Sequence, residues 1–507
     1  MKRTPRIFSI LLTLITVVIV YESCKKSDLD LLPHGPTEAS YFTQESDFTK
    51  AVLGVYAKMD DWYWYNGAQT FGATSSGLNM LLLPGDDITC GDQNTFEIFG
   101  SIDPSNYLIG YFYQIAYQLI ARANVVLEKV AAVEDGVYTT PNLKDYHKGE
   151  VLFLRGFAYY YLWNFYGTSP LDTVRVTSSS QFTPPGTTGT QLLDQAISDF
   201  TEAAALLPTS WDDANRGRVT RNAAYGMLGK SLVFRASFTN TTTDYAGAMA
   251  AFNNISGVQL TDKFDDNFAF DTENNSESLF EFQASQAFAL DNVWLPNDFD
   301  NAVGNISVYW GFYGGPAAVN YGQARFVGTA KLAAAFDPDD PRRAITLDSA
   351  DDILKYITRD KLDQVATGSV NNYRLLRYAD VLLLKAEATL QSGGSSADAI
   401  GYINLVRKRA RDMVPAGIAP ADYSTTETDK ATIMNWIMNE RLIELAGEGQ
   451  RWFDLRRWDK EGIITLDNAY FSSIVNDKMS FQPKHIFFPI PNSEIDVNPN
   501  VKQNDGY

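Results

Sequence analysis

Apolar and small residues recur at helical spacing through most of the chain. The segments 107–130 and 146–166 keep this pattern over long stretches, which predicts two long helices. From Ala196, a phenylalanine, a second alanine and Pro208 follow at offsets of 4, 7 and 12. That is the pattern of the second helix of a tetratricopeptide (TPR) repeat, in which small residues stand where helices approach closely. The sequence therefore predicts a mostly helical protein built from helix pairs.

The same periodicity returns in both halves of the chain. The turn Ser392-Gly393-Gly394-Ser395 separates two of the later helices, and Gly447 ends the last one. Further helices are predicted at 222–236, 245–252, 378–390, 397–410 and 432–446.

Two stretches, 61–104 and 256–373, lack helical periodicity and are rich in Gly, Asp, Asn and aromatic residues. We expect them to form loops and short strands that leave the scaffold, where binding residues tend to lie. The helical scaffold then occupies about 38–255 and 374–460, with a variable insertion at about 256–373 and a C-terminal segment at 461–507.

The N-terminus reads as a secretory leader. Basic residues precede an apolar run from Ile7 to Val20, which is shorter than the ~20 residues that a transmembrane helix needs. Cys24 follows a small residue and resembles a bacterial lipobox of the loose kind found in Bacteroidetes, although Tyr21 and Glu22 depart from the usual motif. We expect a signal peptide at 1–23 and a mature chain at 24–507 acylated on Cys24. An uncleaved anchor or ordinary secretion are the alternatives.

The amino-acid composition argues against several classes of function. The chain has 42 Lys and Arg against 61 Asp and Glu, a net charge of −19, which argues against nucleic-acid binding. Two cysteines and three scattered histidines make a disulfide framework, a zinc site or a Ser-His-Asp triad improbable. Aromatic residues reach 13%, so many rings must lie in a core, on a ligand surface, or both.

Seven motifs stand in a fixed order along the chain. They are Tyr41-Phe42-Thr43 with Gly54-Val55-Tyr56, Ile120-Ala121-Arg122-Ala123-Asn124, Phe153-Leu154-Arg155-Gly156, Phe336-Asp337-Pro338, Leu376-Arg377-Tyr378-Ala379-Asp380, Arg451-Trp452 with Asp454-Leu455-Arg456-Arg457, and Pro489-Ile490-Pro491. In this order they resemble the signatures of the SusD/RagB family, the outer-membrane nutrient-binding lipoproteins of Bacteroidetes. Gly156 departs from the alanine that is usual there.

The resemblance implies a mostly α fold, a TPR-like helix-pair scaffold with a large irregular insertion of loops and short strands that binds ligand. It also implies a partner, a SusC-like TonB-dependent transporter, to which a surface-exposed lipoprotein of the outer membrane delivers an oligosaccharide. Such proteins bind and are not enzymes. The sequence agrees, because it has no nucleophile elbow, P-loop, zinc-protease helix or EF-hand loop.

The family's glycan platform is drawn from the loop before the Ile120 motif and from the later insertion. Aromatic faces there can pack on the C–H groups of sugars while amides bind hydroxyls. The candidates for ligand contact are Trp62, Trp64, Asn94, Phe96, Trp294, Tyr309, Trp310 and Tyr313. Local packing is the alternative for each ring.

The remaining charged motifs favour structure over chemistry. Arg377, Arg441, Arg451, Arg456 and Arg457 alternate with carboxylates, which predicts ion pairs that join helices. A catalytic carboxylate cluster is the alternative.

No cofactor is expected. A calcium site at 262–267 is conceivable, but its spacing is not that of an EF-hand, and a solvated acidic loop is the alternative. Capture of peptides by the same apparatus, a TPR-type interaction scaffold without a small ligand, and an enzyme on this scaffold remain open as functions.

Overall fold

The structure is a computed structural model, and it describes residues 41–59, 62, 76–90, 95–283, 326–356, 371–472 and 478–507. Its helices are α3 (Glu45–Tyr56), α5 (Ser76–Leu82), α6 (Thr95–Ile98), α7 (Tyr107–Ala132), α8 (Leu143–Tyr166), α9 (Gln191–Leu206), α10 (Arg221–Thr239), α11 (Thr242–Asn253), α14 (Ala330–Ala335), α15 (Arg342–Thr346), α16 (Tyr378–Gln391), α17 (Ser396–Asp412), α18 (Lys430–Glu444), α19 (Arg451–Lys460), α20 (Asn468–Ser472) and α21 (Asn492–Ile495). Its strands are β1 (Ile88–Cys90), β2 (Ser278–Phe282), β3 (Phe326–Gly328) and β4 (Tyr373–Arg377).

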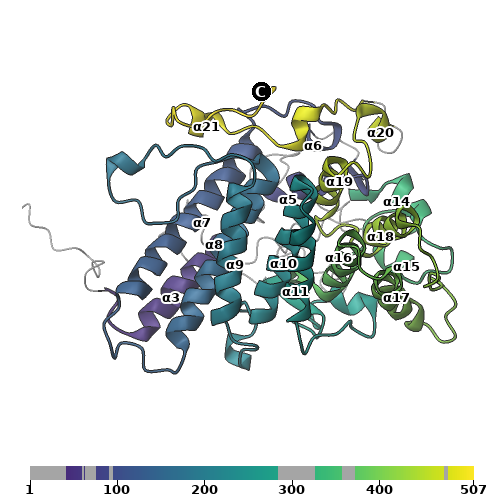
Figure 1. The fold of residues 1–507 in the computed structure, drawn as a ribbon, viewed down its shortest axis with the longest axis horizontal. Helices are drawn as coiled ribbons and strands as arrows, with labels where there is room; N and C mark the ends of the chain where they lie inside the picture. The colour runs from purple at the N-terminus through teal and green to yellow at the C-terminus, as the bar shows by residue number, and fades with distance from the viewer. Residues whose placement is uncertain are drawn as a thin grey trace, which may run out of the picture.

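Consecutive helices lie side by side, as the helix-pair prediction requires (Figure 1). The series α7 to α11 packs in chain order, and α11 then packs on α16, which begins a second group with α17 and α18. The predicted helices are all present with ends displaced by only a few residues, and Gly447 follows α18 at a φ of +73°. The mostly helical fold class is confirmed.

Glycines allow the closest helix contacts. A Cβ on Gly229 of α10 would lie 2.3 Å from the Phe252 ring of α11, and a Cβ on Gly156 of α8 would lie 3.0 Å from Asp199 of α9. Gly156, the departure from the family motif, therefore sits at a helix crossing. These positions explain why small residues appear at repeat spacing in the sequence.

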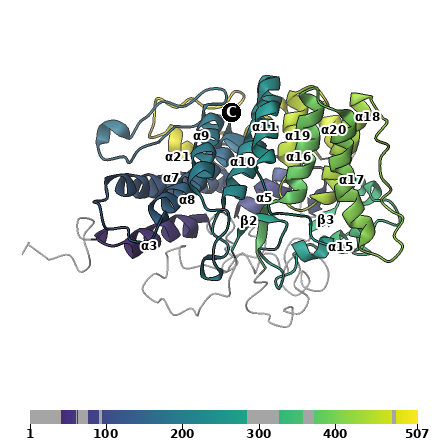
Figure 2. The ribbon, with the colours of Figure 1, turned by 60° about the horizontal axis from the view of Figure 1, so that its bottom comes forward.

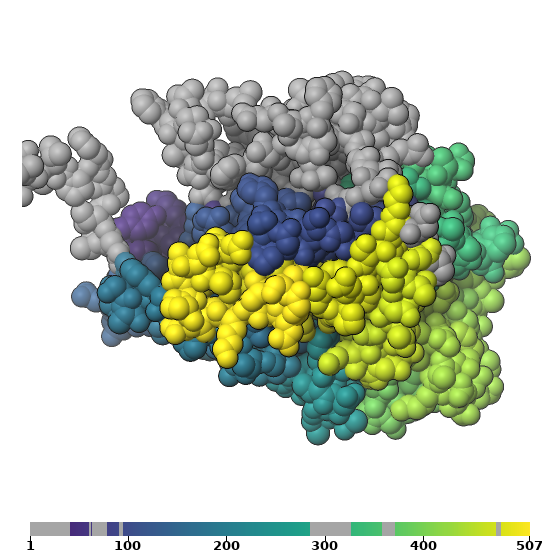
Figure 3. Space-filling view, turned by 90° about the horizontal axis from the view of Figure 1, so that it is seen from above, coloured from purple at the N-terminus to yellow at the C-terminus, as the bar shows by residue number. Residues whose placement is uncertain are grey.

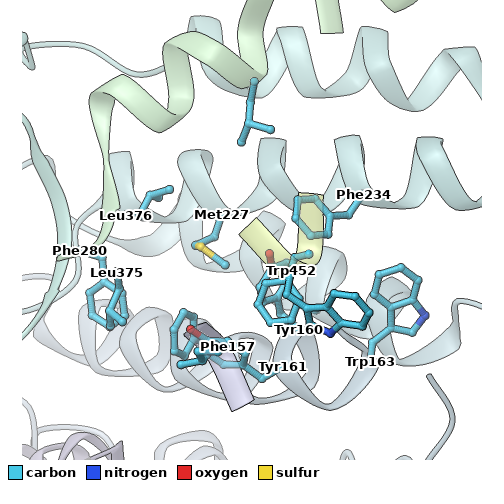
Figure 4. Close-up of a cluster of buried hydrophobic side chains, with 14 of the residues drawn as sticks. Phe157, Tyr160, Tyr161, Trp163, Met227, Phe234, Phe280, Leu375, Leu376 and Trp452 are labelled. Atoms are coloured by element: carbon cyan, nitrogen blue, oxygen red, sulfur yellow. The ribbon is translucent and has the colours of Figure 1, made fainter. Parts of the chain in front are cut away.

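Helix α8 is the centre of the core. Every residue from Gly149 to Tyr166 is buried, because neighbouring elements cover it on nearly all sides. Figure 4 shows rings of this helix, among them Phe157 and Tyr160, in one cluster with Met227 and Phe234 of α10 and Trp452 of α19. One continuous core thus joins the two groups of helices.

The two stretches without helical periodicity supply β1, β2 and β3, and β4 begins at the last residue of the second stretch. Strand β1 pairs with β3, and β2 pairs with β4, both antiparallel. The prediction of short strands is confirmed, although the short helices α5, α14 and α15 were not anticipated. Figure 2 shows β2 and β3 near the lower margin of the helical layer.

The C-terminal segment lies along the upper edge of the helices in Figure 1. Phe488 N–H donates to the Phe165 carbonyl over 2.6 Å, and Asn492 N–H donates to the Pro104 carbonyl over 2.9 Å. In Figure 3 the yellow C-terminal segment accordingly lies beside the blue part of the chain. Among the helices described here, none has the length and apolarity needed to cross a membrane.

Candidate ligand-binding site

The two small sheets bring the ends of the variable segments together. Cys90, at the end of β1, pairs with Phe326 at the start of β3, and Phe282, near the end of β2, pairs with Tyr373 at the start of β4. The segments 91–94, 284–325 and 357–370 therefore connect at the same ends of these sheets. Residues that the sequence places far apart, in the two predicted binding stretches, thus attach to neighbouring strands.

Side-chain amides fix the point where segment 284–325 begins. Asn274 and Gln283 exchange two hydrogen bonds of 2.9 and 3.0 Å, and Asn372 donates to Gln283 over 3.1 Å. Asn372 also donates to the buried carboxylate of Glu281 over 2.8 Å. The start of the segment is therefore held to both strands of the β2–β4 sheet.

A buried ion-pair cluster anchors that sheet to the second helix group. Arg377 of β4 lies 2.6 Å from Glu444 of α18 and 2.8 Å from Glu277, and its Nε donates to Glu448 over 2.7 Å. Arg409 also donates to Glu277 and Glu444. Burial opposes ionisation of Glu444, but Arg409, Arg377 and Arg342 outweigh it and lower its pKa. The carboxylate is held ionised and away from solvent, which is a structural role.

A second buried chain of charges joins α10, α16, α18 and α19. Lys230 lies 2.7 Å from Asp380, which also binds Arg441 over 2.8 Å, and Arg441 reaches Asp454 over 2.8 Å. Arg457 then pairs with Asp454 and, through two nitrogens, with Glu387. The prediction that these motifs lock helices together is confirmed.

Two of the motif arginines bind partners that lie outside the seven motifs. Arg456 donates to the carbonyls of Asn164 and Ile486, so it binds main chain and not a carboxylate. Arg451 pairs with Asp86, 365 positions away, at distances of 2.5 and 3.1 Å. Sequence spacing could not reveal partners that only the fold brings close.

Asp87, the residue after Asp86, carries a buried carboxyl group that has no ion-pair partner within the part of the chain that the structure describes. Asp87 is 3% exposed; its Oδ2 accepts from Gly447 N–H over 3.3 Å, whereas its Oδ1 has no hydrogen-bond partner. Burial, and then the neighbouring Asp86 carboxylate, raise the pKa of Asp87 to about 7. Asp87 directly precedes β1, the strand that pairs with β3.

Two predicted ligand contacts lie in the core instead. Trp62 is 0% exposed; its indole donates to the Phe112 carbonyl over 3.1 Å and its ring stacks on Phe112 at 5.3 Å. Phe96 is 1% exposed and packs 5.6 Å from Phe488. A ring without an exposed face cannot stack on a sugar, so the structure corrects the expectation for these two residues in favour of local packing.

The other predicted contacts and the lipidation site fall outside the described residues. They are Trp64, Asn94, Trp294, Tyr309, Trp310, Tyr313 and Cys24. These assignments stay predictions.

The conceivable calcium loop does not gather its oxygens. Asp262 and Asp265 are exposed, while the Asn267 amide donates to the side chains of Thr261 and Glu277. Within the described ranges, no group of three or more His, Cys, Asp or Glu side chains could hold a metal ion. The expectation that the protein has no cofactor stays a prediction.

Comparison with known proteins gives consistent matches over both halves. The model described as "SusD family" matches residues 352–507, and that described as "Starch-binding associating with outer membrane" matches residues 85–232. A curated relative, SusD-like protein P2 of Formosa agariphila, is 25% identical over 98% of this chain and 99% of its own length.

Solved structures share the architecture. A SusD homolog from Bacteroides thetaiotaomicron has a TM-score of 0.75 at 22% identity, covering 93% of this chain and 99% of its own. Surface glycan-binding protein A from the same organism, solved in complex with laminarihexaose, has a TM-score of 0.71 at 22% identity over 91% of this chain and 100% of its own. At this identity the likeness shows the fold.

Proposed function

Because the chain belongs to the SusD/RagB family, we propose that it is a cell-surface lipoprotein that binds oligosaccharides and delivers them to a TonB-dependent outer-membrane transporter. The observation that carries the proposal is the likeness over 91% of the chain to a surface glycan-binding protein solved with laminarihexaose. The proposed activity is binding and not catalysis. An acyl group on Cys24 would tether the protein to the outer membrane, in line with the family description.

The strand topology supports a ligand site built from the variable segments. The segments 91–94, 284–325 and 357–370 attach at adjoining strand ends, and ion pairs fix strand β4 to helix α18. A rigid base of this kind limits the entropy lost when surface aromatic side chains order around a sugar. We assign the stacking role to Trp294 and Trp310, with Trp64, Tyr309, Tyr313 and Asn94 as further contacts.

Calorimetry with aromatic variants tests this assignment. Trp294→Ala and Trp310→Ala should each weaken binding of the glycan that the wild-type protein prefers by about 1–3 kcal/mol. Neither should lower the melting temperature, whereas Trp62→Ala, a matched change in the core, should lower it markedly. Unchanged affinity in both loop variants would place the site elsewhere.

Delivery to a transporter requires a stable complex. We expect the protein to co-purify with an outer-membrane barrel through an interface above ~2,000 Å², as in permanent complexes. Isolation from membranes without any such barrel would count against delivery while leaving glycan binding in place.

A further inference from the structure

A cavity of about 550 Å³ opens among the loops at one end of the helix pairs. Its walls come from the connection between α9 and α10, including Thr209 and Trp211, and from the connection between α11 and β2, including Val258 and Ser278. The volume falls within the ~300–1,000 Å³ typical of small-molecule sites.

The lining offers unused hydroxyl groups beside apolar surface. The hydroxyls of Thr209, Ser210 and Ser278 form no hydrogen bond within the part of the chain that the structure describes. Val258 and Leu279 contribute apolar wall. Free hydroxyls next to apolar side chains match a ligand that carries both hydroxyl groups and C–H faces.

An aromatic side chain is held rigidly in the wall. The Trp211 indole donates to the Val219 carbonyl over 2.8 Å, and the Arg218 guanidinium lies 4.2 Å from the ring centroid. The Tyr146 ring meets Trp211 edge-on at 5.6 Å. Because these contacts fix the ring before a ligand arrives, little side-chain entropy is lost on binding.

The charged residues that line the cavity form ion pairs with neighbouring residues of opposite charge, which argues for a neutral ligand. Each charged lining residue has an oppositely charged partner: Arg218 with Glu150 at 2.5 Å, Arg216 with Asp213 at 2.5 Å, and Glu281 with Arg374 at 3.3 Å. The buried guanidinium of the lining, Arg218, is already neutralised by Glu150, and the net charge of −19 would repel a uronate or sulfate.

The cavity borders the start of the aromatic insertion. Gly217, a lining residue at a φ of +92°, lies so close to Gln283 that a Cβ would come within 2.4 Å of its side chain. Segment 284–325 begins immediately after Gln283. The cavity therefore lies beside the point where this segment leaves the described part of the chain.

From these observations we propose that the cavity is a second carbohydrate subsite, which binds a neutral stretch of the same glycan through the Trp211 wall and the hydroxyls of Thr209, Ser210 and Ser278. The inference rests on the proposed function and extends it. It adds a class of ligand, neutral oligosaccharides, and a length requirement, because only a chain that reaches both regions gains the extra contact.

A pocket-filling variant with a matched control tests the inference. Thr209→Met places an unbranched apolar chain in the cavity, and Thr425→Met makes the same change at another exposed loop threonine between α17 and α18. The probe is an array of neutral and uronic-acid oligosaccharides of increasing length, with affinities measured by calorimetry. Thermal melts verify that both variants stay folded.

For long neutral oligosaccharides we expect Thr209→Met to bind about five- to tenfold more weakly than wild type. Short ones should bind equally well, and Thr425→Met should match wild type throughout. Equal affinity of Thr209→Met at every length would overturn the second subsite while leaving the proposed function intact. Weakening confined to uronic-acid oligosaccharides would overturn the neutral class. Wild-type protein that binds no glycan would reject the proposed function itself.

Discussion

Arg377 donates two hydrogen bonds, of 2.7 and 2.9 Å, to the Glu448 carboxylate, although 71 positions separate the two residues in the sequence. The first belongs to strand β4, and the second follows helix α18. Both side chains are buried, so this contact fixes the base of the variable segments to the helical scaffold.

Removing this guanidinium should destabilise the fold strongly. Arg377→Met leaves the buried carboxylates of Glu277, Glu444 and Glu448 short of a partner, and we expect a loss of about 3–5 kcal/mol in the free energy of unfolding. Denaturant titration measures it. The control is Lys408→Met, which breaks an exposed pair with Asp412 and should cost at most about 0.5 kcal/mol. Similar losses in the two variants would contradict the anchoring role.

The close packing of α10 on α11 at Gly229 can be tested by adding a methyl group there. Gly229→Ala brings a methyl group against Phe252 and should cost about 1–3 kcal/mol through overpacking. Gly401→Ala, inside α17 with no atom within 4 Å of the new Cβ, should instead stabilise by about 0.5–1 kcal/mol. If thermal melts show both variants stabilised, the close packing of α10 on α11 is wrong.

The buried Asp87 predicts a pH effect of definite sign. Its pKa rises from 3.8 to about 7 on folding, so the folded chain keeps a proton that the unfolded chain has already lost. Its contribution to stability therefore falls as the pH rises from about 4 to about 7.

Asp87→Asn removes that penalty because the amide cannot ionise. The free energy of unfolding of the variant, minus that of wild type, should be larger at pH 8 than at pH 5. The increase should be on the order of 1–3 kcal/mol. Guanidinium unfolding at the two pH values measures the difference. A wild-type-to-variant gap that is identical at both pH values would mean that Asp87 ionises normally.

The lipid anchor can be tested by fractionation. Cys24→Ala removes the only residue in the predicted cleavage region that can be acylated, so the protein should leave the membrane fraction. The experiment is done in cells that lack the transporter, which could otherwise retain the protein. Persistent membrane association of the variant there would reject the lipoprotein interpretation.

The sequence was most informative where structure is local. Helical periodicity located α7, α8, α10, α16 and α17 because side chains on one face of a helix report burial directly. It also indicated that Arg441 and Arg457 bridge helices. It could not find Glu277 or Lys230 as partners, since these pairs depend on packing between distant segments.

The binding stretches were harder to interpret. An aromatic cluster in a loop has the same composition whether its rings face solvent or core, and Trp62 and Phe96 turned out to be core. The sequence does not mark the cavity near Trp211, because its lining residues are common types spread over 209–281. No spacing rule marks residues that converge only when helix ends meet.

The central claim is that this protein captures glycans, and a binding screen of the purified mature chain tests it most directly. The screen presents a glycan array and, in parallel, a peptide digest. We expect saturable binding to at least one family of oligosaccharides, with Kd values of roughly micromolar to millimolar, and no comparable binding to peptides. Binding to peptides alone, or to neither set, would contradict the account.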